Sequence, residues 1–405
     1  MTAKEVRRSF LRWREIPGGV WALGLVSLLM DVSTEMIHAL LPLYLVTVLG
    51  TSMLTVGVIE GVAEATASIV KIFSGALSDK LGKRKLLAAL GYGLAAFTKP
   101  IFPLASGIGW LMAAHFIDRV GKGIRGAPRD ALIADIAPHD LRGASFGLRQ
   151  TLDTIGAFLG PLLAIGLMFL AANNFTLVFW IAVIPAFLSF AVIVFVVREP
   201  ERPPGATLVR SPLSIPQMRR LNTGFWSTVI IATVFTLARF SEAFLLLRAQ
   251  SVGLSLALVP AVLVVMNVAY SFSAWPAGAL SDRIGRFGLL SMGFALLLMA
   301  DLFLALGGNI GVVLLGAVLW GLHMGLTQGL LSALVADTAP PVLRGTAFGI
   351  FNLVTGLAML AASVIAGALW DVIGPQGTFL AGALFTAAAL AGLPLLRQRL
   401  NSSAM

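Results

Sequence analysis

Long apolar runs, separated by short polar or glycine-containing turns, cover nearly the whole chain. A membrane-spanning helix needs about 20 mostly apolar residues. Runs of that kind give these predicted spans: 17–49, 53–78, 85–105, 109–134, 143–171, 174–197, 222–250, 255–281, 287–306, 310–337, 344–370 and 375–396. The pattern therefore predicts an all-α integral membrane protein with twelve transmembrane helices.

One long polar stretch interrupts this pattern near the middle of the chain. Residues 198–221 are rich in proline and arginine, which is typical of a linker. We expect this linker to join two six-helix bundles, formed by residues 17–197 and 222–396. A basic cytoplasmic N-terminus, 1–16, should precede them, and a short cytoplasmic C-terminal tail, 397–405, should follow.

Two internal repeats support the division into halves. The segment GALSDKLGKRKLL, which begins at Gly75, recurs as GALSDRIGRFGLL from Gly278, about 203 residues later. The segment ADIAPHDLRGASFG, from Ala134, recurs as ADTAPPVLRGTAFG from Ala336, with an offset of about 202 residues. Two repeats in nearly the same register indicate two equivalent bundles, which we expect to be related by pseudo-two-fold symmetry.

The composition and the placement of charge agree with a membrane protein. Hydrophobic residues make up 58% of the chain and charged residues only 12%, whereas soluble domains have about 25% charged residues. The net charge of +10 does not indicate nucleic-acid binding, because the basic residues lie in alternate loops. Cysteine is absent, which excludes disulfides and thiolate metal sites.

Lysine and arginine mark one side of the membrane. Among the termini and loops, nearly all of them lie in the N-terminus, the linker, the C-terminal tail and the loops with Lys83, Arg142, Arg283 and Arg344. The opposite loops carry essentially none, with Arg248 the nearest exception. Cytoplasmic loops are the ones enriched in these residues. We therefore expect a multi-pass protein of the cell (inner or plasma) membrane with both termini in the cytoplasm.

The loop between the second and third spans resembles the signature of the major facilitator superfamily, through Gly75, Leu77, Asp79, Gly82, Lys83 and Arg84. A weaker copy, with Asp282 and Arg283, follows the eighth span. The resemblance implies two six-helix bundles around a central cavity, with a substrate site near the middle of the membrane and alternating access. It also implies that Asp79 and Arg84 clamp the halves together on the cytoplasmic side, in a gate formed with Gly75, Gly82, Asp282 and Arg283.

Span 5 carries a finer resemblance. Gly156, Gly160 and Pro161 are similar to the GxxxGP core of the signature of twelve-span drug:proton antiporters. Two small residues one turn apart allow two helices to approach closely, and a proline perturbs the next turn. These residues are therefore candidates for gating, and ordinary helix packing is the alternative.

Span 4 combines a second resemblance with a charged stripe. Arg119 and Gly123 resemble the RxxxG element of the same antiporters, whose arginine is linked with proton coupling, but Lys122 and Arg125 depart from that element and argue against a generic hydrophobic drug. Helical spacing places one set of charges on one face: Asp118, Lys122, Arg125 and Arg129. Charges inside a membrane need a cavity or a partner. The stripe indicates either an electropositive wall for an anionic or zwitterionic solute or a buried network of ion pairs.

Span 1 places Asp31 and Glu35 one turn apart. Two carboxylates on one face repel each other, which favours retention of a proton on one of them. Our hypothesis is that Asp31 and Glu35, with Asp118 and Arg119, couple transport to protons. The alternatives are structural pairing with Lys71 or the span 4 arginines, and a divalent-cation site formed by Met30, Asp31, Glu35 and His38.

Further polar residues lie in other spans. Arg239 and Glu242 form an i,i+3 pair in span 7. With Lys122, Arg125, Asn267 and Gln328 they are candidates for contact with the solute; hydrogen bonding to a neighbouring helix is the alternative for the two amides. Glu60, Glu64 and Lys71 share one face of span 2 and should bond to other helices, while Arg149 and Asp153 should form an ion pair within span 5.

The sequence thus predicts a secondary active transporter of a small organic solute, anionic or zwitterionic, with proton-coupled efflux antiport as the expected mode. Its expected partners are that solute, protons and the lipid bilayer, and we expect a monomer without cofactor, resident metal ion or nucleic acid. The alternatives are a proton symporter that imports an organic anion, a divalent-metal transporter and a non-transporting membrane receptor. No nucleophile–base set or GxxxxGK[ST] loop occurs, so neither an enzyme nor an ATP-driven pump is expected.

Overall fold

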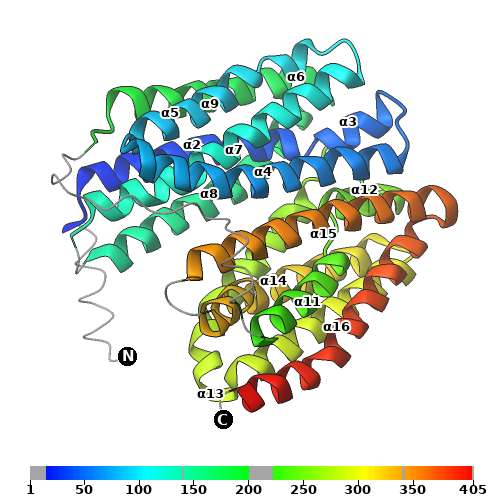
Figure 1. Cartoon of the computed structure of the whole chain (residues 1–405). Coiled ribbons are helices and arrows are strands. Elements are labelled where there is room, and N and C mark those ends of the chain that lie inside the picture. Colours follow the sequence, from blue (N-terminus) through cyan, green and yellow to red (C-terminus); the bar gives the residue numbers. More distant parts are fainter. Residues whose placement is uncertain (1–14, 139–140, 200–220, 222, 340–342, 404–405) are drawn as a thin grey trace. The chain divides into compact units, whose positions relative to one another are not determined.

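The protein is described by a computed structural model over residues 15–138, 141–199, 221, 223–339 and 343–403. These residues form helices joined by short turns, and no β-strand occurs among them (Figure 1). The all-α class is therefore confirmed. The N-terminal segment 1–16 and the linker 198–221 fall almost wholly outside the described residues.

The helical segments follow the apolar runs closely. They are α2 (Gly18–His38), α3 (Leu41–Thr47), α4 (Met53–Leu81), α5 (Arg84–Thr98), α6 (Ile101–Leu104), α7 (Ile108–Ile136), α8 (Arg142–Leu170), α9 (Phe175–Phe195), α11 (Thr223–Ala238), α12 (Ala243–Ser251), α13 (Ala261–Leu306), α14 (Ile310–Thr338), α15 (Arg344–Ile373) and α16 (Pro375–Ser403). Among the described residues, ten segments are long and apolar enough to cross a membrane. The charged α7 and the first part of α13 supply the other two predicted spans.

Glycines in the left-handed region of backbone conformation mark equivalent turns of the two halves. Gly82 has a φ of 68° and its counterpart Gly285 a φ of 72°, while Gly50 and Gly253 have φ values of 63° and 96°. Glycine adopts these values without the steric cost that other residues meet. At Gly285 the backbone departs from helical geometry inside α13, which separates the predicted eighth and ninth spans.

Three of the predicted spans contain a short break in the helix. Span 1 breaks at residues 39–40, span 3 at 99–100 and span 7 at 239–242. Pro42 is the second residue of the helix after the first break, and Pro100 lies within the second break. The third break has no proline; instead the Ser241 hydroxyl accepts a hydrogen bond of 3.2 Å from the Ala243 backbone N–H.

The described residues pack into two compact units. The first is built from Met1–Ile37, Val70–Leu163 and Asn174–Arg210, and the second from His38–Ile69, Ala164–Asn173 and Ser211–Met405, in each case over the part that the structure describes. The division into bundles at the linker partitions the chain differently and stays a prediction.

The first unit is held together around α2. Val20, Leu23, Val26 and other apolar residues of this helix form a buried core with α5, the end of α7, and α9. Two serines add hydrogen bonds across the core: Ser33 Oγ donates to the Ala182 carbonyl and Ser189 Oγ donates to the Val26 carbonyl. The donor–acceptor distance is 2.6 Å in each case. Such bonds satisfy polar groups inside an apolar interior.

The second unit brings the N-terminal half of α4 against α15. A Cβ on Gly57 would overlap the Ser363 carbonyl oxygen, and one on Gly61 would lie 3.0 Å from the Leu360 Cα, so only glycine permits this approach. The Asp371 carboxylate accepts hydrogen bonds of 2.9 Å from the backbone N–H groups of Met53 and Leu54. The carboxylate thereby satisfies free donors at the start of α4.

Candidate functional site

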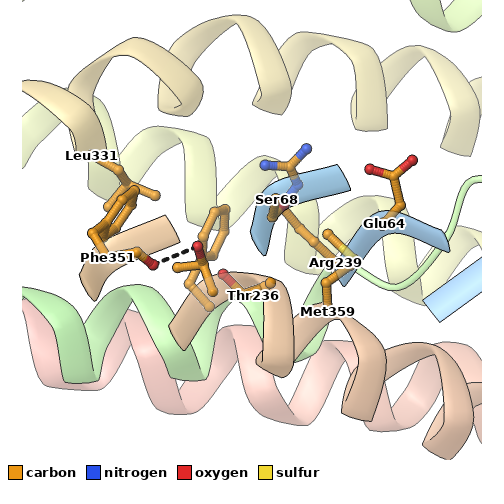
Figure 2. A pocket seen from close by; sticks show the side chains of 10 residues that line it. Glu64, Ser68, Thr236, Arg239, Leu331, Phe351 and Met359 are labelled. Carbon is orange, nitrogen blue, oxygen red and sulfur yellow. Dashed lines mark hydrogen bonds between the residues drawn. The ribbon is translucent and has the colours of Figure 1, made fainter. Parts of the chain in front are cut away.

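A small pocket lies inside the second unit (Figure 2). Its volume is about 190 Å³, which is below the range of about 300–1,000 Å³ for drug-sized ligands. Helices α4, α11, α14 and α15 and the residue after α11 line it through Glu64, Ser68, Phe235, Thr236, Arg239, Leu331, Phe351, Thr355, Gly356 and Met359. The dimensions and the lining fit a small, partly polar molecule.

Opposite charges face this pocket. Glu64 comes from α4, and Arg239 is the first residue of the break in span 7. The Nε of Arg239 is buried and has no hydrogen-bond partner among the described residues, although Glu242 and Tyr270 lie within electrostatic reach. Non-helical backbone at membrane depth is tolerated where it lines a cavity, and discontinuous helices form the substrate sites of many transporters.

Two threonine hydroxyl groups in the pocket lining can accept hydrogen bonds from a ligand, because their own protons are already donated to backbone carbonyls. Thr236 Oγ1 donates its proton to the Ala232 carbonyl and Thr355 Oγ1 to the Phe351 carbonyl, both over 2.7 Å. Each hydroxyl therefore presents lone pairs to a ligand. A ligand that carries N–H donors beside a group able to accept from Arg239 would satisfy this arrangement.

The structure brings one of the predicted solute contacts to the pocket. Arg239 lines it, whereas Glu242 and Asn267 belong to the same unit but are not among the lining residues. Lys122 and Arg125 belong to the first unit, where Lys122 is exposed and Arg125 lies 5.0 Å from the centroid of the Tyr92 ring. The side chain of Gln328 falls outside the described residues.

Two lining residues could have been found from helical spacing. Thr236 and Phe235 precede Arg239 by three and four positions and so share its face of the helix. Glu64 was expected only to bond to another helix. Thr355 and Met359 carry no comparable signal, because their place at the pocket depends on how α15 packs.

In the first unit, Asp118 forms a buried ion pair. Its Oδ1 lies 2.9 Å from Lys99 Nζ, and the two side chains are 2% and 1% exposed. Lys99 Nζ also donates to Thr34 Oγ1 over 3.2 Å. Arg119 and Arg125, which are 2% and 4% exposed, add positive charge within electrostatic reach of Asp118. These contacts favour the alternative of a buried ion-pair network for this part of the charged stripe.

A second network surrounds Arg129, and it includes the ion pair expected within span 5. Arg149 Nη2 lies 2.6 Å from Asp153 Oδ2. Asp130 Oδ1 lies 3.0 Å from Arg129 Nη2 and 3.8 Å from Arg149 Nε, and Arg129 Nη1 lies 3.9 Å from Asp153 Oδ1. Two arginines and two aspartates thus form a closed ring. Of the stripe predicted on span 4, Asp118, Arg125 and Arg129 are buried, whereas Lys122 is exposed.

The glycines of the GxxxGP motif pack against the carboxylates of span 1. A Cβ on Gly156 would lie 2.9 Å from the Asp31 Cβ, and one on Gly160 would lie 2.5 Å from the Glu35 Cβ. Both carboxylate residues are half-buried. Asp153 is a further charged neighbour of Asp31. Two motifs that the sequence assigned separately, to gating and to proton coupling, therefore meet at one helix contact.

We expect Gly160→Ala to destabilise the protein by about 1–3 kcal/mol, the usual cost of overpacking, because the added methyl group would collide with Glu35. The measurement is thermal unfolding in detergent. Gly166→Ala is the matched control, since nothing lies within 4 Å of the added Cβ on the same helix. Equal unfolding temperatures for the two variants would contradict the close contact between α8 and α2.

Only some residues of the predicted cytoplasmic gate have side chains that the structure describes. Arg84 Nη1 lies 2.6 Å from Asp135 Oδ2 and donates to the Ala131 carbonyl over 2.7 Å, so this arginine ties α5 to α7 within the first unit. Gly75 lies close to α7, where its Cβ would be 3.3 Å from the Ala127 Cβ. The side chains of Asp79, Asp282 and Arg283 fall outside the described residues.

The contacts of His38 do not support the alternative of a divalent-cation site in span 1. His38 Nε2 lies 3.3 Å from Glu60 Oε2. Among the described residues, no group of three or more histidine, aspartate and glutamate side chains could hold a metal ion.

Helices long and apolar enough to span a membrane, three of them with a break, and a small polar pocket beside one break are features found in integral membrane transporters. The family model for the Major Facilitator Superfamily matches residues 23–363 and 228–403. An uncharacterized MFS-type transporter of Methanocaldococcus jannaschii is 35% identical over 393 residues, which cover 95% of each chain. The chain therefore belongs to the Major Facilitator Superfamily.

One further relative and one solved structure are similar to this chain. The quinolone resistance protein NorA of Staphylococcus aureus is 27% identical over 218 residues, which cover 53% of this chain and 54% of NorA. A crystal structure of the nucleoside transporter NupG matches with a TM-score of 0.79 and 12% identity, over 93% of this chain and 99% of that chain. At that identity the likeness shows the fold alone.

Proposed function

We propose that this transporter moves a small zwitterionic solute, and that the pocket around Arg239 and Glu64 binds it. The observation that carries the proposal is the presence of a guanidinium and a carboxylate in the lining of one cavity of about 190 Å³. Arg239 would hold a carboxylate of the solute, since its fork of N–H donors matches that group. Glu64, Thr236 and Thr355 would accept from an ammonium group.

We propose proton-coupled efflux as the mode of transport, in a monomer in the cell membrane with both termini cytoplasmic. Asp31 and Glu35 are the proposed proton carriers, and their contact with Gly156 and Gly160 supports a link between protonation and helix movement. NorA, named for quinolone resistance, supports export. Asp118 and Arg119, assigned to coupling from the sequence, instead have contacts that fit a structural role.

Thermal stabilisation by ligands tests the substrate class. The panel contains small zwitterions such as amino acids and betaines, organic anions, amines and divalent metal salts. We expect zwitterions to raise the unfolding temperature of the wild type, because a ligand that binds only the folded state stabilises it. Stabilisation only by metal salts, or only by organic anions, would contradict the proposal.

Neutralisation of the span 1 carboxylates tests the proton carriers. In vesicles containing the purified protein, we expect Asp31→Asn and Glu35→Gln each to lower solute flux driven by a pH gradient by about 100-fold, within the usual contribution of a proton-transfer group. Retained gradient-driven flux in both variants would reject these residues as carriers.

A further inference from the structure

Glu60 joins three spans at one buried carboxylate. It lies on α4 and is 0% exposed. Its Oε2 accepts a hydrogen bond of 3.1 Å from Ser241 Oγ and lies 3.3 Å from Nε2 of His38, the last residue of α2. All three residues belong to the second unit. The sequence placed Glu60 on the polar face of span 2, but the proposed function gives this carboxylate no role.

The direction of the serine hydrogen bond is fixed by its other contacts. Ser241 Oγ accepts from the Ala243 N–H over 3.2 Å, so its single hydroxyl proton is the one that Glu60 receives. The backbone N–H of Ser241 donates to Ser363 Oγ of α15 over 3.2 Å. Glu60 therefore acts as an acceptor and fastens the non-helical break of span 7 to α4.

The contact between Glu60 and Ser241 lies beside the pocket, because both of the segments that it joins also carry pocket-lining residues. Glu64 follows Glu60 by one turn of α4, and Arg239 precedes Ser241 by two residues. Gly57, three residues before Glu60, lets the backbone of α4 approach the Ser363 carbonyl. Any separation of α4 from the break would therefore reshape the pocket lining, and it would require the loss of the Glu60–Ser241 hydrogen bond.

We propose that Glu60 is a second proton-binding site, separate from Asp31 and Glu35, and that its ionised carboxylate clamps α4 to the break of span 7. Protonation of the Glu60 carboxylate removes the negative charge that strengthens both contacts, and so weakens the hydrogen bond from Ser241. A proton on Glu60 therefore releases the break beside the pocket. This inference rests on the proposed function for its biological meaning, but the clamp itself is independent of any solute.

The charged groups around Glu60 come from each neighbouring element. His38 lies at the end of α2, Glu64 follows on α4, and Arg239 and Glu242 flank Ser241 in span 7. The segment of α15 beside the break contributes Ser363, and its nearest charged residue is Asp371 at the end of the helix. His38, which contacts Glu60, and His323 of α14, whose ring centroid lies 5.9 Å from that of Phe235 in the pocket lining, are therefore the competing sites for the proton.

Cysteine labelling tests the clamp directly, because the chain contains no cysteine of its own. Thr236→Cys places a thiol in the pocket lining. Its rate of reaction with a maleimide, corrected for the thiolate fraction with an unfolded control, is measured from pH 5 to pH 8 in the full-length protein. We expect the corrected rate to rise about tenfold towards low pH, a typical size for coupling between two sites.

Added to Thr236→Cys, Glu60→Gln should give the fast rate at every pH, since the amide carries no charge. Ser241→Ala should also remove the clamp, and it serves as the second variant if Glu60→Gln fails to fold. Asp135→Asn, which removes a partly exposed carboxylate of the first unit, should keep the pH response. A pH response unchanged in both Glu60→Gln and Ser241→Ala, or abolished by His38→Gln or His323→Gln alone, would overturn the proposal.

The outcomes separate this inference from the proposed function. A labelling rate that does not depend on pH in the Thr236→Cys protein, together with zwitterion binding, would reject the clamp and leave the transporter proposal standing. A clamp that responds to pH through Glu60 in a protein that binds no zwitterion would reject the proposed substrate alone.

Discussion

Replacement of Asp118 by asparagine is expected to lower the free energy of unfolding by about 3–5 kcal/mol, the usual cost of breaking a buried ion pair by removing one partner. Asp118 is 2% exposed and pairs with Lys99, which is 1% exposed. Arg119 and Arg125 lie within electrostatic reach as well. The substitution would leave three cations together in a poorly solvated region without the carboxylate that balances them.

Two further variants test whether the loss of stability comes from the buried ion pair between Asp118 and Lys99. The double variant Asp118→Asn/Lys99→Met should recover part of the lost stability, because it removes one of the uncompensated charges. Asp135→Asn, on the same helix, should cost about 1 kcal/mol or less, since its ion pair with Arg84 is 31% exposed on the aspartate side. Chemical unfolding in detergent provides the measurement. A stable Asp118→Asn protein that had lost only proton coupling would instead restore the role first assigned to Asp118.

Arg239→Gln is expected to weaken solute binding by about 30-fold to 5,000-fold, because removal of one side of a buried charged contact costs about 2–5 kcal/mol. The substitution leaves the carboxylate of a zwitterion without its guanidinium partner. Binding isotherms on purified protein measure the effect. Glu64→Gln should weaken binding of the zwitterion but spare an analogue that lacks the ammonium group.

Asn267→Ala is the matched control for the pocket. The sequence marked this residue for solute contact, but it does not line the cavity. We expect its solute affinity to stay within about twofold of the wild type, below the cost of a lost direct hydrogen bond. A large loss for Asn267→Ala with little loss for Arg239→Gln would place the solute elsewhere.

The apolar pattern predicted most helices because length and hydrophobicity are local properties. The predicted span 310–337 corresponds to α14, Ile310–Thr338, and 53–78 to α4, Met53–Leu81. The pattern did not reveal the break at 239–242, because no proline marks it. That break depends on Ser241, whose hydroxyl bonds to Glu60 from a span far away in the sequence.

A residue of the candidate site could be predicted from the sequence only where the pattern that marks it lies within a single helix. Arg239 stood out as a charge inside a span, and it does line the pocket. The partner of Asp118 was missed, since Lys99 lies on a different span and the pairing exists only after α5 and α7 have packed. For the same reason the sequence could not connect Gly160 of α8 with Glu35 of α2.

If the pocket around Arg239 binds a zwitterion that the protein exchanges for protons, outward movement of the zwitterion must bring protons inward. This exchange is measured in vesicles with a pH-sensitive dye inside, loaded with the zwitterion that stabilises the protein best and diluted into solute-free buffer. Outward solute movement should acidify the interior in the wild type and leave it unchanged in Arg239→Gln. Alkalinisation, or no solute-dependent change in the wild type, would contradict the claim.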